Sequence, residues 1–193
     1  MPSNKTELAA RIAMTRPTDA VRGLFFRVVF DLLEQRGGAH ALRQARTGAL
    51  AKDISDLRTY PASDYLTLLY NAADALEHKL GNQDAVFNAC GRACVQHFSK
   101  GPGQVVFGIL GKGDPQRLFA QTRVAFSTVV TYGKREHRPA GTHGCIISYR
   151  GDMQPAAYHV GIFEGALESL GFQGTVTARS LTLDSVDYEI SWR

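Results

Sequence analysis

The sequence predicts a single α+β domain in which N-terminal helices pack on a four-stranded antiparallel sheet of β-β-α-β-β order. Apolar residues recur at helical spacing through the first two thirds of the chain, whereas the last third alternates strand-like segments with short turn signals. No internal repeat, low-complexity tract or linker separates these regions. Residues 1–18 are polar and are expected to be loose, so the domain is expected to comprise residues 19–193.

The helical part begins with "VRGLFFRVVFDLLEQRGG". Its apolar residues lie three and four positions apart and Gly37–Gly38 ends the pattern, which predicts one helix followed by a short second helix around Ala39–Arg46. The segment "YPASDYLTLLYNAADALEHKLG" predicts a long amphipathic helix that begins near Pro61 and ends at Gly81.

Further helix signals follow. Asn82 is expected to cap a helix from Gln83 to about Ser99, and the segment "KGPG" is expected to end it. After "QVVFGILG", Asp114 and Pro115 supply a cap and a first helical residue for "DPQRLFAQTRVAF". The intervening "GILGKGD" superficially resembles a phosphate-binding loop. Lys112 is not followed by Ser or Thr, however, and no strand precedes it, so a glycine-rich helix end is expected.

The last third predicts two hairpins joined by a helix. "STVVTYGKREHR" and "THGCIISYR" read as strands around a turn at Pro139–Gly141. A helix from Pro155 to Leu170 is expected to connect this hairpin to a second one and to cover one face of the sheet. "TVTARSLTL" and "VDYEISWR" form the second hairpin around Asp184–Ser185, and a shift of apolar phase predicts a β-bulge near Arg179–Ser180.

Composition narrows the function classes. With 193 residues, 44% hydrophobic and 21% charged, the chain resembles ordinary soluble globular proteins. No apolar run approaches the roughly 18 residues that cross a bilayer, and the N-terminus lacks the apolar core of a secretory signal. A cytoplasmic protein without a membrane span is therefore expected. Its three cysteines do not make a disulfide framework and are expected to be reduced.

The net charge of +4 and the pI of about 9.1 come from dispersed basic residues. Those of the last third include Lys134, Arg135 and Arg138, and no aromatic ladder interleaves with them. We interpret them as a solvated surface rather than a phosphate-binding patch, so no nucleic-acid partner is expected.

The stretch "NACGRACVQHF" contains two cysteines and a histidine. At 100° per residue, Cys90, Cys94 and His97 share the apolar face of an amphipathic helix, where free cysteine behaves as a small buried hydrophobe. Cys90 and His97 lie roughly 10 Å apart along the helix, a gap that their side chains can scarcely close, so Cys94 would have to join them. Any pair of the three could bind a metal ion only with ligands from elsewhere, such as Cys145 or His159. Core packing is favoured, with a metal or haem ligand and a redox-active thiol pair as the alternatives.

The helix "PAAYHVGIFEGALESLG" has two distinct sides. His159 and Phe163 belong to an apolar stripe, whereas Ala157, Gly161 and Gly165 form a ridge of small residues. Glycine inside a helix costs roughly 1 kcal/mol relative to alanine, so the ridge predicts a close backbone approach. Packing within the chain is favoured over a second subunit or a ligand.

Several segments, in this order, resemble a paralogous family of uncharacterised myxobacterial proteins: "GLFF", "YPASDYLTLLYNAA", "GRACVQHFSKGPGQ", "DPQRLFAQ", "YHVGIFEGALESLGF" and "DYEISW". The similarity runs from about Gly23 to Trp192 and brings no established activity. More distantly, the C-terminal helix and hairpin resemble four-vinyl-reductase-type domains, haem nitric-oxide/oxygen-binding domains and trafficking-particle (TRAPP) subunits. This resemblance implies a pocket between helices and sheet for a small aromatic effector, haem or an acyl chain, and pairing as a dimer.

The chain departs from these groups at their metal and haem sites. Four-vinyl-reductase-type sensors place zinc-binding cysteines on the terminal hairpin, where this chain has Ser180 and Tyr188. The Tyr-x-Ser-x-Arg signature of the haem-binding group is absent, because "ISYRGD" keeps a Tyr and an Arg in adjacent positions. Haem would therefore depend on His97 or His159, and a single histidine on an apolar face is usually a hydrogen-bonded core residue.

Catalytic motifs are also missing. The sequence has no Gly-x-Ser-x-Gly, no His-Glu-x-x-His and no Gly-x-x-x-x-Gly-Lys. Asp152 and Glu164 are conceivable as an acid–base pair, but nothing in the sequence defines their separation. A non-enzymatic protein is expected.

The leading hypothesis is a non-enzymatic cytoplasmic sensor or ligand-binding module that holds a small apolar or aromatic ligand between helices and sheet. It would signal through a protein partner or a homodimer. No cofactor, catalytic residue or metal ligand is assigned, and the ligand-binding candidates are His159, Gly161, Phe163, Gly165 and Trp192. The alternatives are a protein-interaction adaptor or assembly subunit with no ligand, and a haem- or metal-based sensor.

Overall fold

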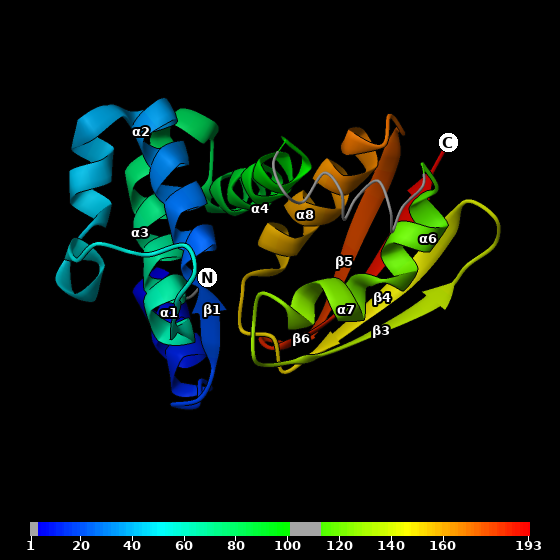
Figure 1. Cartoon of the computed structure of the whole chain (residues 1–193), viewed down its shortest axis with the longest axis horizontal. Coiled ribbons are helices and arrows are strands. Elements are labelled where there is room, and N and C mark those ends of the chain that lie inside the picture. The colour runs from blue at the N-terminus through cyan, green and yellow to red at the C-terminus, as the bar shows by residue number, and fades with distance from the viewer. Residues whose placement is uncertain (1–3, 101–112) are drawn as a thin grey trace.

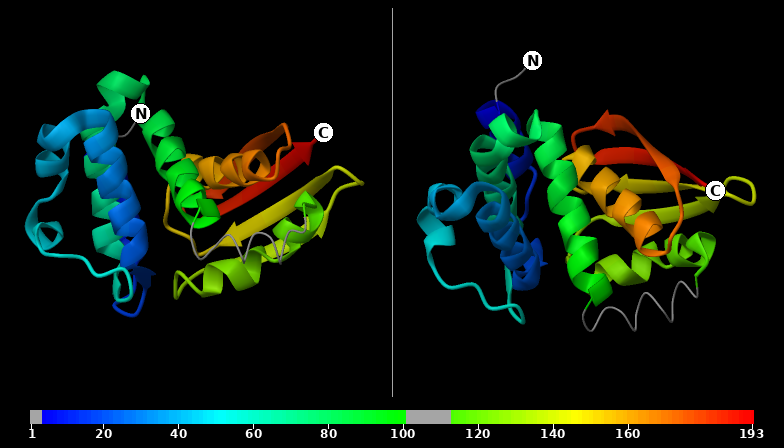
Figure 2. Two further views of the ribbon diagram at one scale, coloured as in Figure 1. Left: turned by 45° about the horizontal axis from the view of Figure 1, so that its top comes forward. Right: turned by 90° about the horizontal axis from the view of Figure 1, so that it is seen from above.

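The computed structural model describes residues 4–100 and 113–193. A helical half and a sheet half lie next to each other (Figures 1 and 2). The helical half comprises α1 (Asn4–Ala13), β1 (Ala20–Arg22), α2 (Gly23–Ala45), the 3-10 helix η1 (Gly48–Ala51), β2 (Thr59–Pro61), α3 (Ala62–Leu80) and α4 (Gln83–Lys100). The sheet half comprises α6 (Pro115–Ala120), α7 (Thr122–Ser127), β3 (Lys134–Pro139), β4 (Gly144–Arg150), α8 (Ala156–Ser169), β5 (Gly174–Thr182) and β6 (Ser185–Trp192).

The four strands of the sheet half are antiparallel and have the spatial order β3-β4-β6-β5. Side chains alternate along β4 and β6, so that Tyr149 and Tyr188 share one buried face with their neighbours two residues away. α6 and α7 cover this face over the first hairpin, and α8 covers it over the second. The predicted α+β fold with two antiparallel hairpins is confirmed. The predicted β-bulge is confirmed as a shift of register between Ser180 and Thr182.

Capping residues and glycines in the sequence predicted most of the helix ends. The Asn82 side chain accepts a hydrogen bond from the Ala85 backbone N–H at 2.8 Å, and the Asp114 side chain accepts one from the Gln116 N–H at 2.9 Å. Within α2, Gly38 has a φ of 73°, which produces the predicted interruption between two helical segments. The helix break at "KGPG", the segment "QVVFGILG" and most of the glycine-rich helix end in "GILGKGD" lie outside the described residues.

Several predictions about the elements are wrong. Residues 4–13 of the segment expected to be loose form α1, because Leu8 and Ile12 pack against the helical core. The helix expected over "DPQRLFAQTRVAF" is broken at Gln121 into α6 and α7. The strand expected from Ser127 begins only at Lys134, because the residues before it turn out of α7 and run beside β1.

α4 and α8 cross in close contact and join the two halves (Figure 1). A β-carbon on Gly161 would lie 2.0 Å from the Asn88 carbonyl oxygen, and one on Gly91 would lie 2.0 Å from the Tyr158 carbonyl oxygen. At Gly165 the nearest atoms, on Val95 and Arg92, are 3.3 and 3.4 Å away. The predicted close backbone approach of the glycine ridge is therefore an approach to α4, within the chain.

Polar contacts flank this crossing. Arg92 of α4 pairs with Glu164 at 2.8 Å and also with Glu168, both on α8. The Asn88 side-chain amide donates to Glu164 at 2.8 Å. Glu164 is therefore engaged at the helix crossing, and the acid–base pair that was conceivable with Asp152 does not form, because Asp152 binds other partners.

Candidate functional site

The five predicted ligand-binding residues lie in two environments. His159, Phe163 and Trp192 are buried in the sheet half, whereas Gly161 and Gly165 face α4. The centroid of the Phe163 ring lies 5.1 Å from that of Tyr188 and 5.9 Å from that of Phe119. The centroids of Phe119 and Trp192 are 5.7 Å apart. These aromatic residues fill the space between α6, α8 and the sheet. The ligand-binding role of the five residues stays a prediction.

His159 is enclosed by aromatic rings. Its imidazole is 1% exposed, and its centroid lies 4.7 Å from that of Tyr149 and 5.3 Å from that of Tyr158. The rings of Phe126 and Tyr188 are both 5.9 Å away. Its Nε2 lies 3.1 Å from an Asp152 carboxylate oxygen, so this buried histidine has a polar partner, as expected for a core residue.

Asp152 connects His159 to a buried arginine. Its second carboxylate oxygen accepts a hydrogen bond from Arg135, and the Gln154 backbone N–H donates to the first oxygen at 3.2 Å. Burial alone would raise the pKa of Asp152, but the adjacent His159 and Arg135 hold that pKa below its ordinary value. The carboxylate is therefore charged at neutral pH, with Arg135 as its counter-ion.

Arg135 is held firmly in this position. Its guanidinium donates to the Tyr132 carbonyl oxygen at 2.7 Å and packs against two rings, with its central carbon 4.7 Å from the Phe126 centroid and 4.9 Å from that of Tyr149. The side chain is only 4% exposed. The interpretation of Arg135 as part of a solvated surface is therefore wrong, because α7 and the loop after it cover the inner face of β3.

Several buried polar atoms around this ion pair have no partner among the described residues. They are Arg135 Nε, the Tyr149 hydroxyl, Gln154 Oε1 and His159 Nδ1. We call Arg135, Tyr149, Asp152, Gln154 and His159 the His159 cluster. Unpaired buried polar groups are rare in folded proteins and usually mark bound water or a ligand.

Arg11 ties the His159 cluster to the helical half. From α1 its guanidinium donates to the Met153 carbonyl oxygen at 2.9 Å and to the Leu183 carbonyl oxygen at 2.7 Å. It also donates to the Tyr70 hydroxyl at 3.0 Å and pairs with Glu7 at 2.7 Å. The segment that carries Asp152 and Gln154 thus contacts Arg135 and His159 on one side and α1 on the other.

The cysteine helix is part of the core. Cys90 is fully buried and Cys94 is 2% exposed, which confirms their predicted position. Cys94 Sγ lies 3.4 Å from the Tyr158 hydroxyl, which lies 2.9 Å from that of Tyr65. Burial raises the pKa of Cys94 to about 11, so its thiol is protonated at neutral pH. His97 is exposed, contrary to prediction, because α8 packs on the Gly91 side of α4 and turns the buried stripe away from it.

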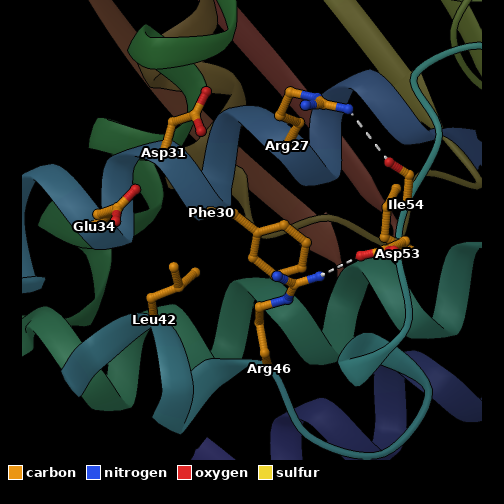
Figure 3. Close-up of a pocket in the computed structure, with 8 residues that line it drawn as sticks. All are labelled: Arg27, Phe30, Asp31, Glu34, Leu42, Arg46, Asp53 and Ile54. Carbon is orange, nitrogen blue, oxygen red and sulfur yellow. Dashed lines mark hydrogen bonds and ion pairs between the residues drawn. The ribbon is translucent and has the colours of Figure 1, made fainter. Parts of the chain in front are cut away.

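Two pockets lie on the surface of the helical half. The first, of about 310 Å³, lies between the two segments of α2 and the loop after η1 (Figure 3). There the Arg46 guanidinium lies 4.8 Å from the Phe30 ring centroid and 3.8 Å from Asp53, and Arg27 pairs with Asp56. The cations of this pocket are thus already paired. The second, of about 240 Å³, lies between α2 and α4 and includes His97.

A third pocket, of about 400 Å³, lies between α7 and the edge strand β3, and we call it the α7–β3 pocket. It is lined by Arg123, Ser127, Val130, Thr131, Tyr132, Gly133, Lys134, Arg135 and Glu136. Val130 forms a β-bridge with Val21 of β1, and the Thr131 hydroxyl accepts from the Ala20 N–H at 2.9 Å. Arg135 belongs to the His159 cluster. The pocket therefore adjoins both halves of the molecule and lies between a helix and the sheet, but none of the five predicted ligand-binding residues lines it.

The residues present do not fit a buried haem with a histidine ligand. All six histidines lie in the described part of the chain, and His159 is the buried one. Its Nε2 contacts Asp152, and the four surrounding rings leave no space for a porphyrin beside the imidazole. Over residues 4–100 and 113–193, no group of three or more His, Cys, Asp or Glu could hold a metal ion.

Known structures share this fold. The unliganded Fe(II) H-NOX protein from K. algicida is 13% identical with a TM-score of 0.71, over 89% of this chain and 96% of that one. The Fe(II)NO H-NOX protein from S. oneidensis is 12% identical with a TM-score of 0.69, over 89% and 99% of the chains. A structure described as probing heme distortion in the H-NOX family is 13% identical with a TM-score of 0.61, over 89% and 95%. At these identities the similarity shows the fold, and it confirms the resemblance to haem nitric-oxide/oxygen-binding domains at that level.

The sequence predicted only part of the His159 cluster. His159 stood out on an apolar stripe, but its partners Asp152 and Arg135 did not, although the hairpin register places Arg135 opposite the inward-facing Tyr149. Arg11 was missed because it lies in a segment expected to be loose.

None of the described helices is long and apolar enough to cross a membrane. No curated protein matches the chain significantly. The model of a protein family of unknown function, DUF2378, matches residues 14–193, and the chain belongs to that family.

Proposed function

We propose that this protein is a non-enzymatic, cytoplasmic sensor module that binds a small organic ligand in the α7–β3 pocket and reports its occupancy through a partner protein or a second copy. The H-NOX-like fold supports a sensor, because the proteins that share it are named for haem and its gaseous ligands. In this chain the ligand would act without haem, since the surroundings of His159 do not accommodate a porphyrin.

One observation supports this proposal most strongly. The segment that lines the α7–β3 pocket makes contacts with both halves of the molecule. Its Val130 and Thr131 contact β1, whereas its Arg135 pairs with Asp152 of the His159 cluster. A ligand that displaces this segment would change contacts on both sides, which is the differential interaction that a two-state sensor needs.

The test combines ligand binding with hydrogen exchange. Native mass spectrometry and thermal melting of the full chain would be recorded with a panel of small aromatic and aliphatic compounds. A binding compound is expected to raise the melting temperature and to slow amide exchange in β1 and in residues 151–155. Protection confined to residues 123–136 would contradict coupling between the halves.

A matched pair of variants locates the site. Ser127→Trp places an indole in the α7–β3 pocket and is expected to abolish binding, whereas Ser180→Trp, at an exposed position on β5, is expected to leave it unchanged. Equal binding by both variants would exclude this pocket. Addition of haem to the purified protein is expected to give no Soret band. A stoichiometric band that His159→Ala removes would instead favour the haem-based alternative.

A further inference from the structure

The α7–β3 pocket has an excess of cationic side chains. Arg123, Lys134 and Arg135 line it, against a single carboxylate, that of Glu136. Arg123 and Lys134 are exposed at the rim, and no hydrogen bond or ion pair from the described residues engages either side chain. Their charges are therefore available to a ligand, unlike those of Arg27 and Arg46 in the pocket of Figure 3.

Arg135 lines the inner wall of the same pocket, with its side chain almost entirely buried. Its two terminal nitrogens are committed, one to the Tyr132 carbonyl oxygen and one to Asp152, whereas Nε has no partner. An unpaired guanidinium N–H that is buried costs free energy unless an acceptor reaches it. The guanidinium also packs against the Phe126 and Tyr149 rings, which contact each other and lie on neighbouring sides of it.

The rest of the lining suits a small apolar body. Val130 and Tyr132 contribute apolar atoms to the lining. The volume of about 400 Å³ falls in the range of roughly 300–1,000 Å³ that is typical of small-molecule sites. β3 is an edge strand, so half of its backbone N–H groups point away from β4 and add potential donors.

We propose that the α7–β3 pocket binds a small organic oxyanion, an aromatic or aliphatic carboxylate or phosphate ester, whose charged group is recognised by Arg123, Lys134 and Arg135. This inference rests on the proposed function and specifies its ligand class. Arg123 and Lys134 donate charge-assisted hydrogen bonds to the anionic group from the rim, while the positive charge of Arg135 lies behind them at the pocket wall. Binding thereby contacts the residue that pairs with Asp152 and communicates with the His159 cluster.

Isothermal titration calorimetry of the full chain tests the ligand class. The probes are benzoate, phenyl phosphate, inorganic phosphate and benzamide, the last being a neutral analogue of benzoate. Benzoate or phenyl phosphate is expected to bind at least about tenfold more tightly than benzamide, because charge-assisted hydrogen bonds are roughly twice as strong as neutral ones. The preferred anion distinguishes a carboxylate from a phosphate ester. If inorganic phosphate binds as tightly as phenyl phosphate, the pocket does not recognise the organic part of the ligand.

Charge variants test the assigned residues. The double variant R123Q/K134Q is expected to weaken anion binding by roughly tenfold or more, while R117Q/R138Q, which removes two exposed cations outside the pocket, is expected to change it little. Glu136→Gln, which removes the opposing charge, is expected to strengthen binding a few-fold. Equal affinities of R123Q/K134Q and the unmodified protein would overturn the assignment.

The outcomes separate this inference from the function on which it rests. If benzamide and other neutral compounds bind and the anions bind no better, the pocket is a ligand site of another class and the inference fails alone. If neither neutral nor anionic compounds bind, the inference and the proposed function fail together.

Discussion

The crossing of α4 and α8 leads to a sharp prediction for Gly161→Ala. The new β-carbon would lie 2.0 Å from the Asn88 carbonyl oxygen and 2.9 Å from the Asn88 α-carbon, both of them backbone atoms that cannot rotate away. α4 must therefore move by about 1 Å, at a cost near the upper end of the roughly 1–3 kcal/mol typical of overpacking. The gain from replacing glycine inside a helix offsets about 1 kcal/mol. We expect a net loss of about 2 kcal/mol.

The matched control is Gly165→Ala, four residues further along α8. There the nearest atoms are 3.3 and 3.4 Å away, so a shift of a few tenths of an ångström suffices. The helix gain then roughly cancels the contact cost, and we expect a stability within about 0.5 kcal/mol of the unmodified protein. Thermal melting separates the two, since a loss of about 2 kcal/mol lowers the melting temperature of a chain of this size by about 4–8 °C.

A double variant tests the mechanism itself. A β-carbon on Gly91 meets α8 at the same crossing, 2.0 Å from the Tyr158 carbonyl oxygen. If the cost of Gly161→Ala is a separation of the two helices, one separation relieves both clashes. The double variant Gly91→Ala/Gly161→Ala should then lose less stability than the sum of the single variants. Gly161→Ala as stable as Gly165→Ala would refute the reasoning.

Three other predictions concern stability and reactivity. Arg11→Ala removes the donor of the buried Met153 carbonyl oxygen and of the part-buried Leu183 carbonyl oxygen, and it is expected to cost about 2–4 kcal/mol in denaturant unfolding. The control Arg16→Ala removes a side chain that is 72% exposed and should cost less than about 1 kcal/mol. Hydrogen bonds from Arg150 and Ser148 lower the pKa of Asp187 to about 2, below its unfolded value, so its contribution to stability is present above about pH 4 and lost as the pH falls towards 2. The stability difference between the unmodified protein and Asp187→Asn should therefore shrink over that range, and a constant difference would contradict this account. Cys94, whose pKa is raised by burial, should react with a thiol reagent only at the rate of unfolding, and rapid labelling of the native protein would show that the site opens.

The predictable parts of this fold depend on neighbouring residues. Asn82 was recognisable as a cap because its acceptor serves an N–H three residues later, and Gly81, with a φ of 106°, was recognisable as a helix end. The turn of the first hairpin was also predictable, because the residues that form it are adjacent in the sequence. The ridge of Gly161 predicted a close approach from helix propensity alone, but only the fold could supply Asn88 as its partner.

The unpredicted parts depend on what covers a residue. Strand alternation places Arg135 on the inner side of β3, yet whether that side is buried depends on α7 and the loop after it. Helical spacing placed His97 within the apolar stripe of α4, but the position of α8 rotated the buried stripe away from it. Besides its local pair with Glu7, Arg11 donates to carbonyl oxygens more than 140 positions away, and no local signal predicts those hydrogen bonds.

The reach of Arg11 has a consequence for the order in which the chain folds. Arg11 and Leu183 are 172 residues apart, so the first helix leaves the ribosome long before the hairpin that accepts its hydrogen bond exists. α1 can pack on α3 early, because Leu8 and Ile12 contact the helical core. The hydrogen bonds from Arg11 to Met153 and Leu183, however, must wait until nearly all of the chain has been made. Closing such a long loop is a late and entropically costly step. We therefore expect the attachment of Arg11 to the sheet half to be a late event of folding, and its loss to be an early event of unfolding.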